Sequence, residues 1–310
     1  WRVLELAKSK PIKHLMLNTN GVKIAAERDF AKKLAAYMPG FEVYLQFDSL
    51  RAESLVKLRG EDLREVRLKA LERLNEHNVS TTLVVTLQKG VNDGEIGEII
   101  DFALKQKCVR GVTFQPVQVA GRLDAFHAEN DRLTLSEVRQ KILEQSPVFK
   151  PEDVIPVPCH PDCLAMAYAL KMGECVTPLT GMMDPKLLLS GEGNTIVYER
   201  HKGVREQIFK AFSTAHSPGS GALALKHLLC CLPEIQVPEE IGYSNLFRVI
   251  IMKFMDAWDM DVRSVKKTCV HIVHPDGRII PFDTFNLFYR DEREKALVRQ
   301  EMVGVTVGGR

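Results

Sequence analysis

The fold is decided by the stretch "VSTTLVVTLQKGVNDGEIGEIIDFALKQKCVRGVTFQPV", residues 79–117. Its two ends, residues 79–87 and 110–117, are short apolar runs rich in β-branched residues, which is typical of buried strands. Between them, apolar residues recur at helical spacing and share one side of a predicted helix: Ile96, Ile99, Ile100, Ala103 and Leu104. A strand, a helix and a second strand of these lengths predict a right-handed crossover between two parallel strands.

The same alternation precedes this stretch. Residues 14–21, "HLMLNTNG", and residues 41–48, "FEVYLQFD", have the composition of strands, and residues 25–37 and 58–78 are predicted helices. Four strands separated by helices favour the α/β class, with a parallel sheet that is either open or barrel-like.

The alternation stops after Arg122. Thr134 or Ser136 could cap a helix, and a proline-rich segment then leads to Cys159. Residues 181–230 are predicted to be mostly helical, and residues 245–259 to contain a buried strand. Apolar runs on both sides of Asp276-Gly277 predict a hairpin over residues 269–286. We therefore expect two domains, residues 1–130 and 131–310.

Composition argues against some classes of function. The chain has 45% hydrophobic and 26% charged residues and a net charge of +2, which is typical of a globular protein without a broad cationic surface. Nucleic-acid binding has no support from this balance. No apolar run approaches the roughly 18 residues of a spanning helix, so we expect a cytoplasmic protein. The chain begins at Trp1 within ordered-looking sequence, and we expect that an upstream segment is missing.

Polar residues follow each of the four predicted strands. In parallel sheets the carboxyl ends of the strands meet at one edge, where ligands commonly bind. Asn-Gly and Asn-Asp-Gly sequences also form ordinary turns. Because such residues follow all four strands, we expect a polar ligand pocket lined by Asn18, Thr19, Asn20, Gln46, Asp48, Ser49, Lys89, Asn92, Asp93, Gln115, Gln118 and Arg122.

The seven cysteines are an odd number, and six of them lie in the second half of the chain. Without a secretory signal, a disulfide framework is disfavoured, and metal binding or catalysis are the alternatives. If a helix begins within residues 160–170, the thiols of Cys159 and Cys163 would lie near its first turn, where thiolates are favoured. With Cys269 and one of the adjacent Cys230 and Cys231 they could hold a [4Fe–4S] cluster, while Cys175 has no compelling partner spacing and Cys108 is expected in the core. Tetrahedral zinc and packed free thiols are the alternative interpretations.

Histidines near these cysteines are further candidates. His160 lies between the first two cysteines, and His271 and His274 lie on the predicted hairpin beside Cys269. Each could be a ligand or a structural side chain. The sequence contains no Ser-His-Asp arrangement, Walker loop or His-Glu-x-x-His pattern, so a hydrolase has no support.

The succession of motifs resembles the radical S-adenosylmethionine (SAM) superfamily. "LMLNTNG", "VYLQFDSL", "LVVTLQKGVNDGEIGEII" and "VTFQPVQVAGR" resemble strands three to six of its partial (β/α) barrel. "PVPCHPDCLAMAYAL", "LLCCLP", "FRVIIMKFMDAWD" and "KTCVHIVHPDGRIIPFDTFNLFYRD" resemble more narrowly the branch of tetraether lipid synthase, also described as class D radical SAM methyltransferases. The resemblance implies the C-terminal part of the barrel, followed by an α+β auxiliary domain.

In this superfamily a Cys-x-x-x-Cys-x-x-Cys loop binds the [4Fe–4S] cluster that cleaves SAM, and a Gly-Gly-Glu-type segment holds the SAM amino group. This sequence contains neither motif, so the fragment alone is expected to be inactive. The resemblance assigns SAM binding to Gln46, Gln115, Asp48 and Thr19. It assigns an auxiliary iron–sulfur cluster to Cys159, Cys163, Cys269 and Cys231. Where the SPASM-type hairpin pattern usually has Pro-Cys, this chain has Pro281-Phe282.

The resemblance implies an enzyme that uses [4Fe–4S] clusters and SAM to form a 5′-deoxyadenosyl radical and functionalise unactivated carbon. The expected reaction is carbon–carbon bond formation on lipid chains, with methylation of a pterin precursor as the alternative. A zinc-stapled binding module is the non-enzyme alternative. Expected partners are a small-molecule or lipid substrate and an electron donor such as ferredoxin or flavodoxin, and a lipid substrate would place the protein at the membrane periphery. Candidates for a lipid tunnel, or for ordinary core, are Phe247, Met252, Phe254, Met255 and Trp258.

Overall fold

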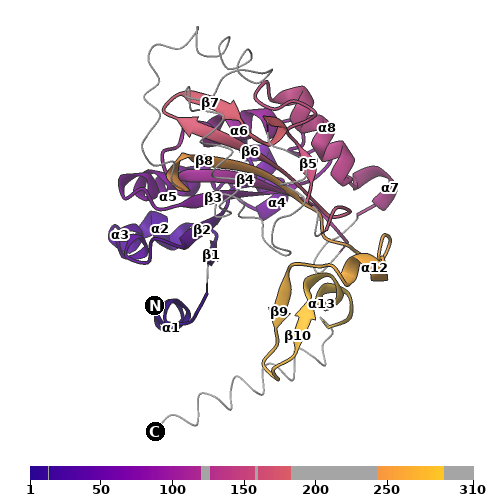
Figure 1. The fold of residues 1–310 in the computed structure, drawn as a ribbon, viewed down its shortest axis with the longest axis horizontal. Coiled ribbons are helices and arrows are strands. Elements are labelled where there is room, and N and C mark those ends of the chain that lie inside the picture. Colours follow the sequence, from indigo (N-terminus) through magenta and orange to yellow (C-terminus); the bar gives the residue numbers. More distant parts are fainter. Residues whose placement is uncertain (13, 120–125, 158–159, 183–242, 290–310) are drawn as a thin grey trace, which may run out of the picture.

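The computed structural model of the chain describes residues 1–12, 14–119, 126–157, 160–182 and 243–289. Its centre is a sheet of eight strands in the order β1-β2-β3-β4-β8-β6-β5, with β7 paired to β6 (Figure 1). The strands are β1 (Leu15–Thr19), β2 (Phe41–Gln46), β3 (Thr81–Leu87), β4 (Val109–Pro116), β5 (Ile155–Pro156), β6 (Leu164–Met172), β7 (Cys175–Pro178) and β8 (Leu246–Met252).

The first half of this sheet is parallel. Neighbours in the series β1, β2, β3, β4 and β8 run in the same direction. Strand β6 runs antiparallel to β8, β5 and β7. The predicted α/β class and parallel sheet are therefore confirmed, and the arrangement is consistent with a partial barrel. Strands β5, β6 and β8 continue the sheet of β1–β4, and the division into domains at residue 130 stays a prediction.

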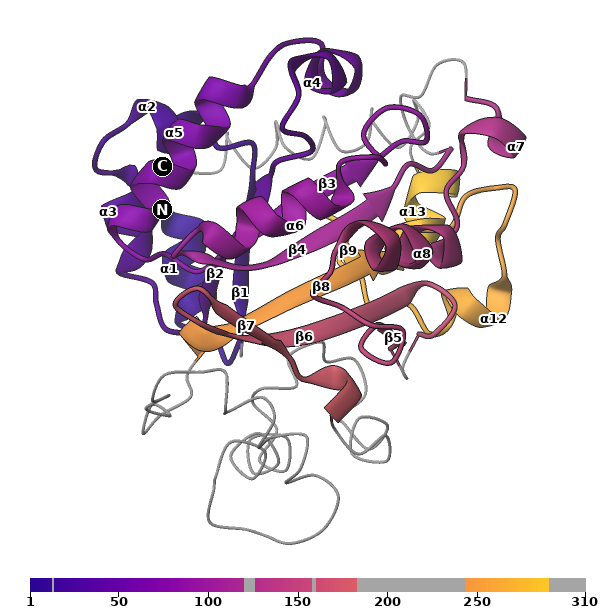
Figure 2. The same ribbon diagram turned by 90° about the horizontal axis from the view of Figure 1, so that it is seen from above.

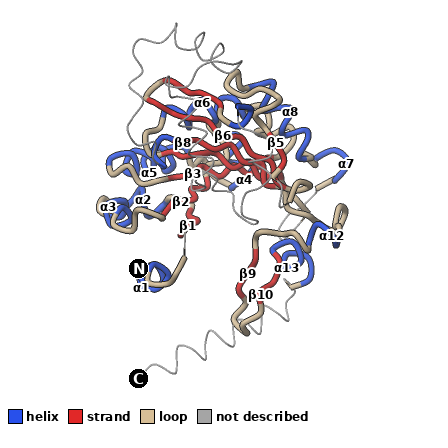
Figure 3. The backbone as a smooth tube through the Cα atoms, viewed as in Figure 1, coloured by secondary structure: helices blue, strands red, loops and turns tan. Residues whose placement is uncertain are grey.

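Helices cover one face of the sheet (Figures 2 and 3). Those that contribute to the main core are α2 (Val22–Ala26), α3 (Phe30–Ala35), α5 (Arg64–Glu76), α6 (Ile96–Lys105) and α8 (Leu135–Gln145). The other helices are α1 (Arg2–Lys8), α4 (Ala52–Arg59), α7 (Ala128–Asp131), α12 (Val262–Val265) and α13 (Phe282–Phe288), with 3₁₀ turns η1 (Thr180–Met182) and η3 (Tyr243–Asn245).

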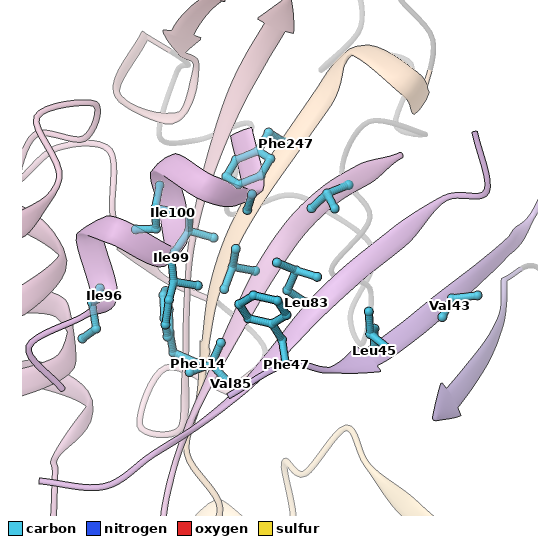
Figure 4. Close-up of a cluster of buried hydrophobic side chains, with 14 of the residues drawn as sticks. Val43, Leu45, Phe47, Leu83, Val85, Ile96, Ile99, Ile100, Phe114 and Phe247 are labelled. Carbon is cyan, nitrogen blue, oxygen red and sulfur yellow. The ribbon is translucent and has the colours of Figure 1, made fainter. Parts of the chain in front are cut away.

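The main core lies between this helical layer and the sheet. Ile96, Ile99 and Ile100 of α6 are fully buried there, as their predicted common side requires, and lie beside Phe114 and Val85 of the sheet (Figure 4). Helix α6 also packs closely on α8, because a Cβ at Gly97 would lie 2.2 Å from the carbonyl oxygen of Gln145. Glycine is thus required at this position for the two helices to approach.

The predicted cap of α8 is confirmed. Thr134 is the N-cap residue, its Oγ1 accepts from the Glu137 amide (3.2 Å), and the Glu137 carboxylate accepts from the Thr134 amide (2.7 Å). This reciprocal capping box satisfies two amides that the helix itself leaves without partners.

The conditional prediction of a helix within residues 160–170 is wrong. Strand β6 occupies Leu164–Met172. Its side chains alternate in size. Three alanines face the helical layer, where they leave room for α8. The large residues face the opposite side and form a second apolar cluster, which contains Leu164, Met166, Tyr168 and Leu170. A continuous apolar run favours strand or helix equally by hydrophobicity alone, but the alternation of small and large residues has the period of a strand.

The terminal hairpin is confirmed. Strands β9 (His271–Val273) and β10 (Ile279–Pro281) pair antiparallel, and Gly277 in the turn adopts a φ of +87°, which favours glycine. The predicted strand within residues 245–259 is also confirmed, as β8. The helical prediction for residues 181–230 lies outside the described residues, apart from the turn η1. Within the described part of the chain, every helix is too short or too polar to cross a membrane.

Candidate functional site

The face of the sheet opposite the helices is polar over β1–β4. Side chains alternate between the two faces of a strand, and on β2 Val43 and Leu45 point into the main core. The residues between them therefore line the opposite, inner face. Polar residues that share this face are Asn18, Glu42, Tyr44, Gln46, Thr82, Thr86, Thr113 and Gln115.

Gln46 ends β2 at the carboxyl edge of the sheet, where the sequence placed a ligand pocket. Its Nε2 donates to Asn18 Oδ1 (3.1 Å) on β1, and its Oε1 accepts from Arg59 Nη2 (3.3 Å) on α4. These two contacts fix the orientation of the amide. An amide nitrogen carries two hydrogens, so the second N–H of Gln46 can still donate to a ligand at this edge.

Asp48 is completely buried and holds Arg59 in place. Its carboxylate accepts from Arg59 Nε (2.8 Å) and Nη2 (2.7 Å), from Arg67 Nη2 (3.2 Å) and from the Thr86 amide (3.1 Å). The hydrogen bonds that Arg59 donates to Asp48 raise the pKa of Arg59, so this guanidinium stays charged. Of the predicted SAM-binding residues, Asp48 thus faces protein groups in the structure, and its carboxylate connects α4 and α5 to the edge of the sheet.

Gln115 and Thr19 lie at the same edge as Gln46. Gln115 Nε2 lies 3.9 Å from the sulfur of Met252, a weak acceptor, which leaves the amide free to bind more strongly to a ligand. Thr19 Oγ1 accepts from the Gly21 amide (3.2 Å) in the turn after β1. Asn18 and Gln46 are thus in contact on the inner face, Gln115 lies at the same edge two strands away, and Thr19 braces a turn.

Other residues predicted for the rim hold loops together. Asn92 Nδ2 donates to the carbonyl oxygens of Asp48 and Thr86 (both 2.8 Å). Ser49 Oγ donates to the buried carboxylate of Glu95 (2.7 Å). The sequence did not indicate Arg59 or Glu95 as site residues. No local pattern shows that Arg59 at the end of α4, or Glu95 at the start of α6, points toward the strand ends. Arg122 lies outside the described residues.

A buried charged cluster occupies the inner face further from the edge. Arg248 Nη2 of β8 donates to both carboxylate oxygens of Glu42 on β2 (2.9 and 3.0 Å). Glu42 also contacts His14 Nε2 (2.9 Å) and accepts from Thr82 Oγ1. Beside it, Tyr44 Oη donates to Thr113 Oγ1 (2.7 Å), and burial raises the pKa of Tyr44 to about 12. These groups keep the inner face polar and internally satisfied.

A second ion-pair network closes the edge beside β4 and β8. Asp256 is buried and accepts from Arg132 Nη2 (2.6 Å) and from the Val119 amide (2.9 Å). Burial alone would raise the pKa of Asp256, but the hydrogen bonds from Arg132 and from backbone amides lower it below its usual value. Asp259 accepts from Arg132 and from Lys253. Residues after β4 and after β8 are thereby joined at the rim.

The predicted cluster ligands fall into two groups. Cys159 and Cys231 lie outside the described residues. Cys163 is buried just before β6, and burial raises the pKa of its thiol to about 12. Cys269 is half-buried, with its sulfur 3.7 Å from the Lys267 carbonyl oxygen. Cys108 is fully buried in the main core, as expected.

Two of the candidate histidines lie in buried positions. His160 is 3% exposed, it bonds to the Ser264 backbone, and its Nε2 has no partner among the described residues. Burial lowers the pKa of His160. His274 Nδ1 pairs with Asp276 (2.9 Å), and His271 is exposed.

The carboxyl edge of this parallel sheet is polar, and ligands commonly bind at such an edge. Residues 2–103 match the radical SAM superfamily. This range contains β1, β2 and β3, with Thr19, Gln46 and Asp48. Radical SAM enzymes use [4Fe–4S] clusters and SAM.

Two curated proteins are similar to this chain. One is a 7,8-dihydro-6-hydroxymethylpterin dimethyltransferase of Methanocaldococcus jannaschii, 28% identical over 346 residues, which cover 94% of this chain and 65% of that protein. The other is described as a probable GTP 3′,8-cyclase of Thermococcus kodakarensis, 33% identical over 106 residues, which cover 33% of each chain. The chain thus spans less than two thirds of the methanogen relative.

Gln46 and Gln115 present amide groups at the carboxyl edge, and amides carry donors and acceptors that suit the polar parts of SAM. The assignment of SAM binding to these residues stays a prediction. The described parts of the chain bring no three metal-ligating side chains together. The described residues therefore supply two thiols, and the auxiliary cluster stays a prediction that depends also on Cys159 and Cys231.

Proposed function

We propose that this chain is the greater part of a radical SAM methyltransferase that acts on a pterin-like heterocycle. The observation that carries the proposal is the similarity to the methanogen pterin dimethyltransferase, which extends over 94% of this chain and therefore beyond the superfamily match at residues 2–103. This was the alternative in the sequence interpretation, and the comparison favours it over carbon–carbon coupling of lipids.

The polar inner face supports a heterocyclic substrate. Amide groups of Asn18, Gln46 and Gln115 lie at the edge of this face, and the Glu42–Arg248 pair lies deeper on it. A pterin carries ring nitrogens, an amino group and a carbonyl group, all of which form hydrogen bonds. Burying such groups beside amides costs less than burying them against an apolar wall.

The lipid interpretation has less support from the described residues. Phe247 was a candidate for a tunnel wall, yet it points into the main core on the helical side of β8. Met252 packs with the cluster on the opposite face, and Trp258 is 74% exposed. These three side chains point in different directions and do not share one wall.

When bound, a reduced [4Fe–4S] cluster and SAM supply the radical chemistry of the superfamily. The task of this chain is to bind and orient SAM and substrate and to exclude water. Gln46 would donate through its free N–H to an acceptor on SAM, because Arg59 already occupies its carbonyl oxygen. Gln115 would bind from the next but one strand. A ferredoxin or flavodoxin as the source of the electron is part of this proposal.

The test is product analysis with the complete protein of which this chain is part. Anaerobically reconstituted protein, reductant, SAM, a one-carbon donor (further SAM or a reduced pterin that carries a one-carbon unit) and 7,8-dihydro-6-hydroxymethylpterin should yield pterins with one or two added methyl groups. Gln46→Ala should strongly reduce product formation, whereas Lys57→Gln, an exposed lysine on α4, should leave it unchanged. Absence of any methylated pterin from a preparation that does cleave SAM would contradict the proposed substrate.

The auxiliary cluster is proposed with a test of its own. Cys159, Cys163, Cys231 and Cys269 would hold it, since iron–sulfur clusters take four thiolates. Elemental analysis of the anaerobically purified complete protein should find more iron than one SAM-cleaving [4Fe–4S] cluster contains. The Cys163→Ala variant should lack this additional iron. Zinc without excess iron would instead support the zinc-stapled interpretation.

A further inference from the structure

A cleft of about 1040 Å³ lies at the amino-terminal edge of the sheet, away from the edge that carries Gln46 and Gln115. Arg110 is the second residue of β4, and Ser244 and Asn245 precede the parallel strand β8. Lys171 is the penultimate residue of β6, which runs antiparallel to β8 and so brings this residue to the same edge. The cleft is therefore built by strand ends and does not belong to the proposed catalytic edge.

Positive charge predominates in this cleft. Among the residues that the structure describes, four cationic side chains line it, Lys105, Lys107, Arg110 and Lys171, against two carboxylates, Asp101 and Glu174. In the part of the chain that the structure describes, the three lysines form no ion pair with an acidic side chain. Like charges gathered around a concave surface repel one another and attract an anion from solution.

The two inner cations are held in position by the fold. Arg110 is 2% exposed, and its Nη1 and Nη2 donate to the Lys107 carbonyl oxygen (2.7 Å) and to Asn78 Oδ1 (2.9 Å). Lys171 is half-buried, and its Nζ donates to the Gln106 carbonyl oxygen (2.6 Å). An ammonium carries three hydrogens, so two remain for a ligand. Burial and, second, the charge of Arg110 lower the pKa of Lys171 to about 8. Both effects disfavour the charged ammonium, and a bound anion would offset them.

We propose that this cleft binds a soluble small molecule that carries a phosphate or diphosphate group. Ammonium and guanidinium groups together are the usual partners of phosphate oxygens. The volume of the cleft corresponds to a metabolite, because small-molecule sites occupy roughly 300–1,000 Å³. Among the described lining residues, cationic side chains outnumber carboxylates, which suits a phosphate anion. This proposal does not depend on the proposed methyl transfer.

The test is calorimetric titration of the 310-residue chain with inorganic pyrophosphate at near-physiological salt. Saturable binding is expected, and Lys171→Gln and Lys107→Gln should each weaken it about fivefold to tenfold, since each removes a charge-assisted contact. Lys57→Gln, on α4, should bind as the parent does. Thermal unfolding of every variant confirms that it is folded.

A second arm separates a soluble ligand from a lipid headgroup. Vesicles of phosphatidylglycerol should not bind more tightly than neutral phosphatidylcholine vesicles, and they should not compete with pyrophosphate. The proposal is overturned by a failure to bind pyrophosphate. It is equally overturned by unchanged affinity in the folded Lys107→Gln/Lys171→Gln double variant, or by binding to acidic vesicles alone.

Discussion

Arg248 and Glu42 form a buried ion pair across the inner face of the sheet, with the guanidinium 2.9 and 3.0 Å from the two carboxylate oxygens. Their strands β8 and β2 are not neighbours, because β3 and β4 lie between them. Gly111 of β4 pairs with Arg248 and has no side chain to obstruct its path. Since the pair bridges strands that are three positions apart, the inner face must be concave, as a partial barrel requires.

Breaking this pair should destabilise the protein strongly. Arg248→Met would remove the guanidinium that pairs with the buried Glu42 carboxylate, which costs about 3–5 kcal/mol of the free energy of unfolding. Urea denaturation followed by circular dichroism measures the loss. Arg263→Met, which removes an exposed cation from the Arg263–Asp261 pair, is the matched control and should leave the midpoint unchanged. Equal midpoints for both variants would show that the Arg248–Glu42 pair does not stabilise the sheet.

The close contact between α6 and α8 can be tested by substituting Gly97. Gly97→Ala places a Cβ 2.2 Å from the Gln145 carbonyl oxygen, so the helices must separate, at a cost of about 1–3 kcal/mol. Gly94→Ala is the control, because a Cβ there meets nothing within 4 Å. Thermal unfolding should show a lower midpoint for Gly97→Ala alone. A midpoint as high as that of the Gly94 variant would contradict the close packing.

Arg59 should act on SAM only through Gln46. In the complete protein, Arg59→Met should weaken SAM binding about fivefold to tenfold, because the Gln46 amide loses one of the two contacts that orient it. Because the same change takes a cation away from the buried Asp48 carboxylate, urea denaturation first establishes that the variant is folded. In a Gln46→Ala background the same change should have little further effect, which a double-mutant cycle measures. Arg64→Met, on the exposed Arg64–Asp62 pair, is the control. Additive losses in the double variant would rule out a positioning role.

The thiol of Cys108 should be inert while the protein is folded. Burial raises its pKa to about 11, so the thiolate is scarce at pH 8 and the sulfur is also inaccessible. The half-buried Cys175 should be alkylated by iodoacetamide much faster, as peptide mass spectrometry can follow. After unfolding in urea the two should react alike. Rapid alkylation of Cys108 in the native protein would mean that the core opens locally.

The sequence predicted the elements whose signals are local. The strands of residues 14–117, helix α6, the Thr134 cap and the Asp276-Gly277 hairpin all depend on residues close together in the chain. Two helix predictions were too coarse, because residues 25–37 span the end of α2 and all of α3, and residues 58–78 span the end of α4 and all of α5, with Gly60 ending α4. The prediction failed at β6, because a continuous apolar run was interpreted through the cysteines before it. In that run, the alternation of alanine with large residues has the period of a strand and could have indicated β6.

The site was predicted less completely, for a physical reason. Parallel strand ends meet at one edge, so Gln46 and Gln115 could be placed there from their positions alone. Whether a side chain is free or engaged depends on distant partners. Glu42 and Arg248 are 206 residues apart, and Asp48 is neutralised by Arg59 and Arg67 from two different helices. No spacing in the sequence indicates such contacts.

The central claim is that the radical chemistry of the complete protein is directed at a pterin-like heterocycle. The most direct test measures 5′-deoxyadenosine formation from SAM by the reduced, anaerobic enzyme with and without candidate substrates. We predict that 7,8-dihydro-6-hydroxymethylpterin stimulates 5′-deoxyadenosine formation and that the Gln46→Ala variant loses this stimulation. Stimulation by a diether lipid with no response to the pterin would contradict the claim and favour carbon–carbon coupling of lipid chains.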